Sequence, residues 1–311
     1  MSVRNVIRRM AKKAIPDKLF ASLTGDLYTE ELEKAKKDIF TNKSLLEKYG
    51  QEIAYLKKEG GLVIFPYSFQ EKYDARKIDV LLDKEIGLRY VIHDHKRLYF
   101  PRAWEEKRIR NYYNGLLIEQ DIESPHRYFT DKFKVEKGDV FVDVGCAEAM
   151  SSLECVDTAD EIYLFECSEE WKEALNATFG GRCGNKVHII PKYVRNYSDE
   201  ESITLDEALK ESFGKNFLIK LDLNGYEWDV LSGSPNFLNT QKIRCLGCTY
   251  HRQQDESILL PNLQKAGFEC EFSTGYMLFL FSELKYPYFR RGLIRANNYD
   301  IIDEKKNVVG I

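Results

Sequence analysis

Residues 140–150, VFVDVGCAEAM, place two carboxylates around a single glycine. The pattern is typical of a buried strand that turns sharply into a helix, with Asp143 at the strand end, Gly145 in the turn and Glu148 beside the helix start. Gly145 permits a positive φ or a close approach of the backbone to a ligand. Glu166 follows 23 residues after Asp143 at the end of the next strand, where a carboxylate can accept hydrogen bonds from ribose hydroxyls. Together these residues predict a nucleoside-type cofactor site.

The charge of Glu148 discriminates between cofactors. A dinucleotide pyrophosphate prefers glycine-rich backbone at a helix N-terminus, and a carboxylate there would repel it in a partly desolvated cleft. S-adenosylmethionine has a ribose, a sulfonium and an ammonium group but no phosphate, so it suits the site better. The alternatives are a dinucleotide and a turn without any cofactor. In the latter case Asp143 would cap the helix, Glu148 would interact with the helix dipole, and Glu166 would be a solvated carboxylate.

A second set of polar residues follows two later strands. Lys220 and Asp222 end the run NFLIKLDL, Glu227 lies in the next helix, and His251 follows IRCLGCTY. Removing a proton from an attacking hydroxyl needs a base in reach, and we expect His251, whose ordinary pKa is near neutrality, or Asp222 in that role. Lys220 would hold Asp222 ionised or pair with Glu227. The alternatives are a divalent cation on Asp222 and an ion pair that only closes the strand–helix junction.

Residues outside these strand ends are predicted to contact a substrate: His126 and Arg127 in SPHRYF, Tyr250 beside His251, and Arg290 in YPYFRRGLIRANN. We expect SPHRYF to fold over the cofactor as a lid, unless Pro125 merely starts a helix. Arginine forks suit a phosphate or carboxylate on a substrate, although the same arginines could line a solvated surface. Arg195 and Asn196 lie where an adenine-reading residue is expected, without further support.

Strands and helices that would position these residues alternate from residue 139 onward. Apolar runs rich in Val, Ile, Leu and Phe predict strands buried on both faces at 140–145, 161–167, 186–194, 216–223 and 243–250. Amphipathic segments predict helices at about 149–157, 169–179, 204–213, 227–239 and 254–266. Two last strands, ECEFSTG and YMLFLFSEL, have no helix between them and are expected to pair as an antiparallel hairpin at one sheet edge. The sequence predicts an α/β fold with a doubly wound, mostly parallel seven-stranded sheet and an antiparallel last strand.

The chain before this sheet has a different pattern. We expect a basic helical segment over 1–60 and a small α+β region over 61–130, with a hairpin turn at Asp94–Lys96 and a charged helix over about 104–119. His93 and His95 in this hairpin do not make a metal site without further ligands. The main domain is expected over 131–285, followed by a C-terminal tail over 286–311.

The composition excludes several classes of protein. A net charge of −4 argues against a general nucleic-acid binder, and no apolar run is long enough to suggest a membrane span. The seven cysteines, all between Cys146 and Cys270, are typical of reduced thiols in a cytoplasmic protein. The first 23 residues hold six Lys or Arg against one Asp, so a weak peripheral membrane contact is conceivable beside a docking or disordered end.

Several motifs, in this order, resemble FkbM-type S-adenosylmethionine-dependent methyltransferases: GDVFVDVGCAEAMSSL, YLFECSEEW, ITLDEAL and IKLDLNGYEWDVLSG. EQDIESPHRYFTD, TYHRQQDE and GYMLF also resemble a branch of that family, so the resemblance covers about residues 115–298. It implies a class I, Rossmann-like methyltransferase fold and methylation of a hydroxyl, often on a sugar or a natural-product scaffold. The first turn departs from the family, which is richer in glycine where this chain has Ala147 and Ala149.

Three functions follow from these observations. The leading hypothesis is an S-adenosylmethionine-dependent O-methyltransferase that acts on a glycan, a saccharide precursor or a related small metabolite. The second is a non-catalytic module of a polysaccharide assembly system with a degenerate cofactor turn. The third is a nicotinamide oxidoreductase, which Glu148 and the missing glycines disfavour.

Overall fold

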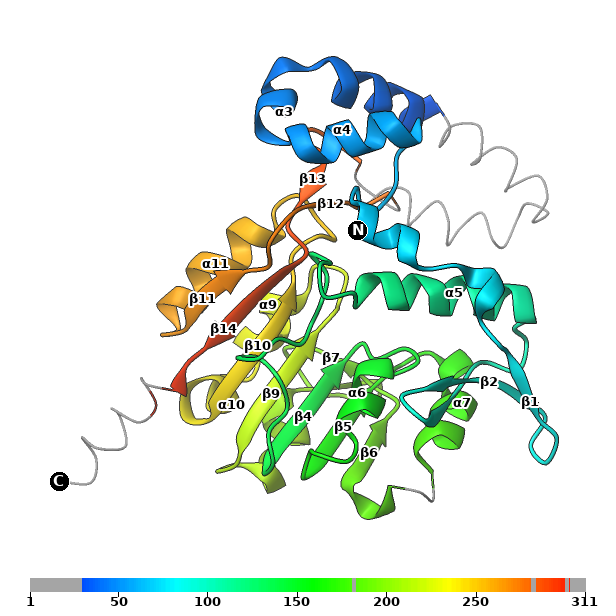
Figure 1. The fold of residues 1–311 in the computed structure, drawn as a ribbon. Coiled ribbons are helices and arrows are strands. Elements are labelled where there is room, and N and C mark those ends of the chain that lie inside the picture. The colour runs from blue at the N-terminus through cyan, green and yellow to red at the C-terminus, as the bar shows by residue number, and fades with distance from the viewer. Residues whose placement is uncertain (1–29, 181–182, 281–283, 300–301, 303–311) are drawn as a thin grey trace, which may run out of the picture. The chain divides into compact units, whose positions relative to one another are not determined.

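The computed structural model describes residues 30–180, 183–280, 284–299 and 302 of the 311-residue chain. The chain divides into two compact units, Met1–Tyr67 with Leu278–Phe289, and Ser68–Met277 with Arg290–Ile311 (Figure 1). The basic stretch over residues 1–23, for which the sequence suggests a membrane contact, lies outside the described residues. Within the described part of the chain, no helix combines the length and the apolar character needed to cross a bilayer.

A mixed seven-stranded sheet forms the centre of the second unit in the described structure, with the order β11-β14-β10-β9-β4-β5-β6 (Figure 1). All its strands run parallel except β14, which is antiparallel to both of its neighbours. Its strands are β4 (Asp139–Val144), β5 (Glu161–Phe165), β6 (Val187–Ile190), β9 (Asn216–Leu221), β10 (Lys242–Cys248), β11 (Glu269–Phe272) and β14 (Leu293–Asn297). The predicted α/β, mostly parallel sheet is therefore confirmed.

Helices follow the parallel strands, as the alternating pattern predicts. They are α6 (Met150–Cys155), α7 (Glu169–Phe179), α8 (Leu205–Ala208), α9 (Glu227–Ser232), α10 (Pro235–Thr240) and α11 (Asp255–Lys265). Every residue of β4 is buried, and so are five of the six residues of β9, because both faces of the sheet are covered. The continuous apolar runs in the sequence have this physical origin.

Proline and glycine divide two elements that the sequence analysis predicts as continuous. The strand expected over 186–194 is split at Pro191 into β6 and the short β7 (Tyr193–Val194), which pairs with β8 (Ser202–Ile203). The helix expected over 227–239 is split into α9 and α10 at Gly233 and Pro235. A Cβ on Gly233 would lie 2.1 Å from the Cα of Asn196, so this glycine lets two loops approach closely. The helix expected over 204–213 continues beyond α8 only as the 3-10 turn η4 (Lys210–Ser212).

The predicted terminal hairpin is wrong in its second strand. β11 pairs with β14, whereas the segment expected as its partner contributes β12 (Met277–Leu278), which pairs with β13 (Phe289–Arg290). β14 lies in the range 286–311 that the sequence analysis assigns to a C-terminal tail. The arginines in and just before β14 suggest a surface segment, but Arg295 of the strand is only 6% exposed and donates to the main-chain carbonyls of Arg127 and Tyr128.

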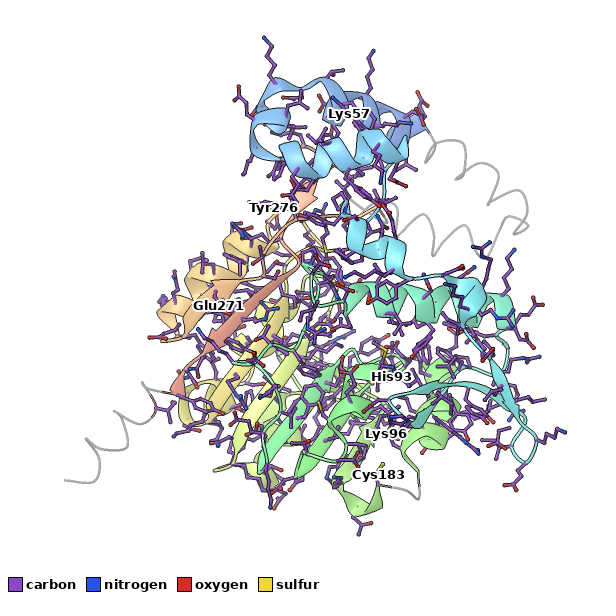
Figure 2. The ribbon with its side chains drawn as sticks, in the orientation of Figure 1. Lys57, His93, Lys96, Cys183, Glu271 and Tyr276 are labelled. Carbon is purple, nitrogen blue, oxygen red and sulfur yellow. The ribbon has the colours of Figure 1, made fainter. Side chains whose placement is uncertain are left out.

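The segment before the sheet forms an antiparallel sheet and a long helix. The strands are β1 (Leu81–Asp83), β2 (Leu88–His93) and β3 (Lys96–Tyr99), followed by α5 (Glu106–Glu119), and the 3-10 turns η1 (Ser68–Lys72) and η2 (Ala75–Lys77) precede them. The predicted turn after His93 is confirmed, with Asp94 and His95 both at positive φ. His93, labelled in Figure 2, hydrogen-bonds Tyr113 of α5 and Glu154 of α6 through its two ring nitrogens, each at 2.9 Å. The hairpin thereby fixes α5 relative to the start of the main sheet.

The first unit contains a helical stretch over residues 30–41 followed by α3 (Lys43–Lys48) and α4 (Gly50–Glu59). Its core includes Ile39, Leu45 and Ile53. Two tyrosine hydroxyls tie its segments together, Tyr67 to Glu52 at 2.5 Å and Tyr288 to Asp38 at 2.8 Å. This unit holds none of the residues that the sequence analysis selects for chemistry.

Candidate active site

The order of the strands determines where a ligand would bind. The chain moves outward from β4 through β5 to β6 and then returns to β9 on the other side of β4. In open α/β sheets, ligands bind beyond the carboxyl ends of the strands at such a reversal. Here those ends are Val144 and Leu221, which pair in register. Asp143, Gly145, Lys220 and Asp222 flank this point, as the sequence analysis expects.

The turn after β4 requires glycine at one position. Gly145 has φ +75°, and a Cβ on it would lie 2.4 Å from the main-chain oxygen of Asp222. Its N–H donates to the carbonyl of Phe165 at 3.0 Å. Gly145 thus allows the loops that follow β4 and β9 to approach closely, and the observed contact is with protein backbone.

Two alanines in the same turn take the left-handed conformation that glycine adopts without strain. Ala147 has φ +46° and Ala149 has φ +60°. The turn therefore keeps a glycine-type backbone path without the glycines.

Glu166 is oriented toward this turn by two main-chain amides. Its Oε2 accepts from the N–H of Ala147 at 3.0 Å, and its Oε1 accepts from the N–H of Ser168 at 2.7 Å. Each oxygen keeps a further lone pair, and the residue is half-buried. A carboxylate fixed in this way can accept hydrogen bonds from two neighbouring hydroxyls, as a ribose would offer.

Asp143 and Lys220 form a buried ion pair across β4 and β9. Lys220 Nζ lies 2.7 Å from Asp143 Oδ1 and also donates to the carbonyl of Gly145 at 3.2 Å. Asp143 Oδ2 accepts from Ser152 Oγ at 2.7 Å. Burial works against the charged amine, but the carboxylates of Asp143 and Asp222 hold the pKa of Lys220 above its ordinary value. Lys220 therefore pairs with Asp143, and the expected pair with Glu227 is absent from the described ion pairs.

Asp222 receives three hydrogen bonds at the end of β9. The hydroxyl of Tyr128 donates to its Oδ2 at 3.0 Å, and Tyr250 and His251 lie 3.2 and 3.1 Å from its Oδ1. Burial opposes ionisation, but the His251 hydrogen bond and the charges of His251 and Lys220 hold the pKa of Asp222 well below its usual range. Asp222 is thus a strong hydrogen-bond acceptor and a weak proton acceptor.

His251 lies between two carboxylates. Its Nε2 is 3.1 Å from Asp222 Oδ1 and its Nδ1 is 3.4 Å from Glu227 Oε1. Burial alone would favour the neutral ring, but these two acids raise the pKa of His251 to about 9. An imidazolium has no lone pair with which to accept a proton, so the geometry argues against the role of base that the sequence analysis assigns to His251. Glu227 also accepts from the N–H groups of Leu223 and Gly225, which stabilises the turn before α9.

The predicted substrate contacts are mostly engaged with protein. His126 is 3% exposed, its ring packs against Tyr128 and Tyr250, and burial lowers the pKa of His126 to about 4. Arg127 donates to the carbonyls of Gln120 and Phe129, and Arg290 to the carbonyl of Tyr250. We therefore assign both arginines to holding loops in place. In the segment SPHRYF it is Tyr128 that reaches Asp222.

Residues of α5 complete the site, and the sequence analysis does not select them. Tyr112 donates to Glu148 Oε2 at 2.7 Å, and burial raises the pKa of Glu148. Glu119 lies seven residues after Tyr112, hence on the same helix face. Burial, together with the charges of Asp222 and Glu148, raises the pKa of Glu119 to about 8. The seven-residue spacing is the only sequence signal that could have indicated this pair.

Arg195 and Asn196, the residues considered for adenine, are exposed. The Arg195 guanidinium stacks on the rings of Tyr193 and Tyr197 and donates to the Tyr197 hydroxyl at 2.6 Å. Asn196 lies against Gly233. These contacts explain both residues by local packing.

The described residues contain two groups that could hold a metal ion: His126, Asp222 and Cys248, and Glu227, His251 and Asp255. In the first, burial holds the pKa of the Cys248 thiol well above its usual value, and Asp222 is occupied by three donors. In the second, His251 is charged, and burial raises the pKa of Asp255 to about 6. Metal ligands must be deprotonated, so neither donor set fits a divalent cation.

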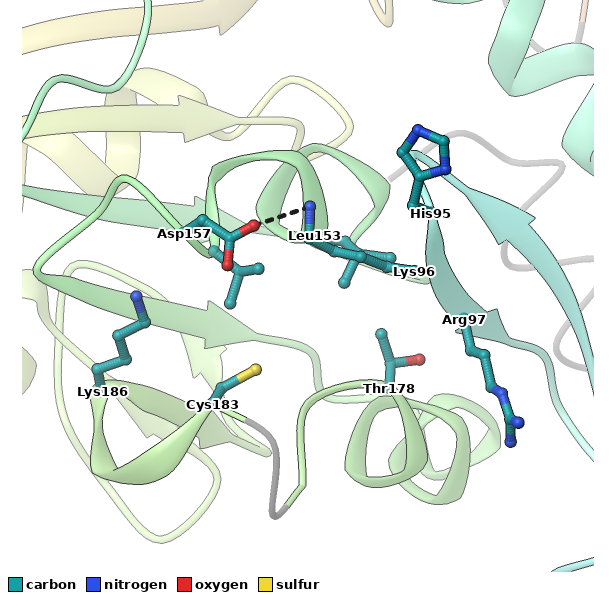
Figure 3. Close-up of a pocket in the computed structure, with 9 residues that line it drawn as sticks. His95, Lys96, Arg97, Leu153, Asp157, Thr178, Cys183 and Lys186 are labelled. Carbon is teal, nitrogen blue, oxygen red and sulfur yellow. Dashed lines mark ion pairs between the residues drawn. The ribbon is translucent and has the colours of Figure 1, made fainter.

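A cavity of about 310 Å³ lies at a different place, between the β2–β3 hairpin and the C-terminal ends of α6 and α7 (Figure 3). Lys96 and Asp157 form an ion pair of 3.0 Å across it. A smaller one of about 100 Å³ is lined by Glu227, Arg252 and Asp255 among others. The larger of these two cavities holds none of the carboxylates at the strand ends, so we place the candidate chemistry at the side-chain cluster and not at this cavity.

The sequence matches no protein-family model and no curated protein. Among solved structures, the methyltransferase FkbM from Methylobacillus flagellatus is 13% identical, with a TM-score of 0.41 over 61% of this chain and 53% of that chain. Trm5b from Pyrococcus abyssi is 13% identical, with a TM-score of 0.38 over 71% and 62%. Precorrin-6y C5,15-methyltransferase from Geobacter metallireducens is also 13% identical, with a TM-score of 0.37 over 53% and 84%. At these sequence identities and TM-scores, the similarities do not indicate an activity for this chain.

Proposed function

We propose that this protein is an S-adenosylmethionine-dependent O-methyltransferase of FkbM type that acts on a hydroxyl of a sugar, a glycan precursor or a related small metabolite. The observation that carries the proposal is an excess of carboxylates over cations at the strand reversal. Within the described chain, the carboxylates are Asp143, Glu148, Glu166, Asp222 and Glu227, and the cations are Lys220 and His251. A site of this charge favours a cationic ligand without phosphate.

The residues present fit this cofactor. Glu166 would accept the ribose hydroxyls, because two main-chain amides hold its carboxylate beside the turn after β4. Glu148, in the same turn, adds negative charge that would repel a pyrophosphate. When bound, S-adenosylmethionine supplies an electrophilic methyl group on a sulfonium.

The acceptor would bind at the ends of β9 and β10. Asp222 presents two oxygens there, and the hydroxyls of Tyr128 and Tyr250 that now contact it offer further polar groups. We propose that Asp222 orients the acceptor hydroxyl, which would replace one tyrosine at the carboxylate. As the oxygen–methyl bond forms and the methyl–sulfur bond breaks, the hydroxyl proton would pass to solvent. His251 and Glu227 would hold Asp222 in position, because the imidazolium bridges them. Much of the rate of such a transfer can come from alignment and exclusion of water.

The acceptor class rests on the motif resemblance and on overall charge. A net charge of −4 disfavours a nucleic-acid acceptor, since phosphates are usually met by a basic surface. We therefore propose a saccharide or small-molecule acceptor in the cytoplasm.

Calorimetry with S-adenosylmethionine, S-adenosylhomocysteine and NAD tests the proposal. We expect both adenosyl ligands to bind, and NAD not to bind. Glu166→Gln should weaken the binding of both by roughly tenfold or more, because a charged acceptor to the ribose is lost. Glu169→Gln, an exposed change in the first turn of α7, is the matched control and should bind like the wild type.

Two results would contradict the assignment. Absence of binding by any of the three ligands would favour a non-catalytic module, and binding of NAD alone would favour an oxidoreductase. The identity of the bound ligand therefore distinguishes the three functions before any reaction rate is measured.

A further inference from the structure

Glu119 differs from every other carboxylate at the proposed cofactor site. It lies in the last turn of α5, half-buried, and no donor in the described chain lies within hydrogen-bond distance of its oxygens. The other acids each have donors with measured distances: Asp143 has Lys220 and Ser152, Glu166 has two main-chain amides, and Glu148 has Tyr112. Glu119 alone is left without a hydrogen-bonding partner.

The surroundings of Glu119 are acidic and polar. The charged groups that act on it are Asp222 and Lys220 from β9 and the loop after it, and Glu148 from the turn before α6. Glu119 in turn acts on the hydroxyls of Tyr112 in α5, Tyr128 in the loop after α5 and Tyr250 after β10. Lys220 is committed to Asp143 at 2.7 Å, so no free cation of the described cluster neutralises Glu119.

We propose that Glu119 binds the ammonium group of the cofactor's amino-acid end, and that cofactor binding releases the proton that Glu119 carries in the free protein. This inference rests on the proposed function. An ammonium group donates hydrogen bonds to a carboxylate, and such charge-assisted bonds are about twice as strong as neutral ones. The released proton passes to the solvent.

The ammonium group is a better partner for Glu119 than the sulfonium. The positive charge of the sulfonium disappears as the methyl group leaves, so a carboxylate against it would stabilise the bound reactant more than the transition state. The ammonium keeps its charge throughout. A carboxylate placed there binds reactant, transition state and product equally, which is what a cofactor anchor requires.

The direction of the pH effect follows from linkage. Glu119, with its pKa raised to about 8, is mostly protonated in the free protein at neutral pH. A bound cation favours the ionised form, so binding expels the proton, and affinity rises with pH up to that pKa. Above about pH 8 the ligand's own amino group loses its proton, which limits the rise.

Calorimetry of S-adenosylhomocysteine binding in buffers of different ionisation enthalpy measures the released proton directly. For the wild-type chain we expect close to one proton released per ligand at about pH 7, and roughly tenfold tighter binding at about pH 7 than at about pH 6. Glu119→Gln should bind without proton release and with an affinity independent of pH in this range. 5′-Methylthioadenosine, which lacks the amino-acid end, should release no proton from the wild-type protein.

Control variants and ligands distinguish a failure of the role of Glu119 from a failure of the proposed methyltransferase function. Glu106→Gln, in the first turn of α5 where Glu106 pairs with Arg110 on the surface, should behave as wild type. Thermal unfolding checks the fold of Glu119→Gln, which should be no less stable near neutral pH because it removes a carboxyl without a partner. Proton release that persists in Glu119→Gln, or that 5′-methylthioadenosine also causes, would overturn the role of Glu119. If wild-type protein binds neither adenosyl ligand, the proposed function itself fails.

Discussion

Two alanines in the turn after β4 illustrate how single residues determine this site. Ala147 and Ala149 hold a left-handed backbone at φ +46° and +60°. A Cβ in this region costs about 1–2 kcal/mol. The cost is met because the same turn is tied to Glu166 through the N–H of Ala147.

Ala147→Gly should stabilise the protein by about 1 kcal/mol, because it removes that steric cost. Ala177→Gly, inside α7, is the matched control and should destabilise by about 1 kcal/mol, since glycine there only adds freedom to the unfolded chain. Urea unfolding of both variants measures the difference. If both variants changed the free energy of unfolding in the same direction, the proposed strain in the turn would be contradicted.

The buried pair of Asp143 and Lys220 is a second feature at this scale. Their side chains are 1% and 7% exposed. Lys220→Met should destabilise by roughly 3–5 kcal/mol, because it leaves Asp143 charged and uncompensated in the core. Asp143→Asn in the same chain should recover part of the loss.

Lys172→Met tests whether burial is the cause. Lys172 pairs with Glu169 at 3.3 Å, but their side chains are 57% and 76% exposed. We expect a change within about 0.5 kcal/mol. A comparable loss for the exposed and the buried lysine would show that burial is not what makes the inner pair important.

At the scale of elements, the site depends on the close approach of the loops that follow β4 and β9. Gly145→Ala would place a Cβ 2.4 Å from the main-chain oxygen of Asp222, in addition to an unfavourable φ. We expect a loss larger than the about 1–2 kcal/mol of the backbone term alone. Gly115→Ala in α5, with no atom within 4 Å of the new Cβ, should instead stabilise by about 1 kcal/mol. Thermal unfolding of the pair provides the comparison, and similar shifts would refute the close approach.

The helix α5 contributes to the candidate site through one whole face and not through a short sequence motif. It places Tyr112 and Glu119 on one face, and the His93 hydrogen bonds to Tyr113 and Glu154 fix this helix against the sheet. The predicted helix over about 104–119 is confirmed, yet its part in the site could not be read from the sequence. A helical periodicity shows which residues share a face but not what that face meets.

At the scale of the whole molecule, the Asp222–His251–Glu227 cluster links stability to pH. The folded state raises the pKa of His251 from its unfolded value near 6.5 to about 9. The stabilisation from protonated His251 is therefore complete below about pH 6.5 and is lost as pH rises through about 9. Each pKa unit corresponds to about 1.4 kcal/mol, so the loss is on the order of 3–4 kcal/mol.

Unfolding free energies measured from about pH 6 to about pH 9.5 check this expectation. His251→Gln should show a smaller decline than the wild type, because only the ionisation of Glu119 below about pH 8 still lowers its stability. His95→Asn, at an exposed hairpin position of positive φ, should keep the full decline. An identical decline in the wild type and in His251→Gln would show that another group is responsible.

The fold class was determined by the sequence alone, because strands buried on both faces must be apolar along their whole length and the helices between them must be amphipathic. The carboxyl ends of such parallel strands meet at one edge, so Asp143, Gly145, Glu166, Lys220 and Asp222 could be assigned to a common site from their positions. The sequence did not reveal β14, since Arg295 and the arginines just before the strand resemble a surface segment until the carbonyl partners of Arg295 are known.

The partner of each polar group could be assigned only from the folded chain. Lys220 pairs with Asp143, His251 lies between two acids, and Glu119 has no hydrogen-bond donor among the described residues. Charge states in a cleft depend on distances between groups that are far apart in the chain, here between α5, β4, β9 and the end of β10. No local pattern encodes those distances, so the chemistry of the site appears only once the chain is folded.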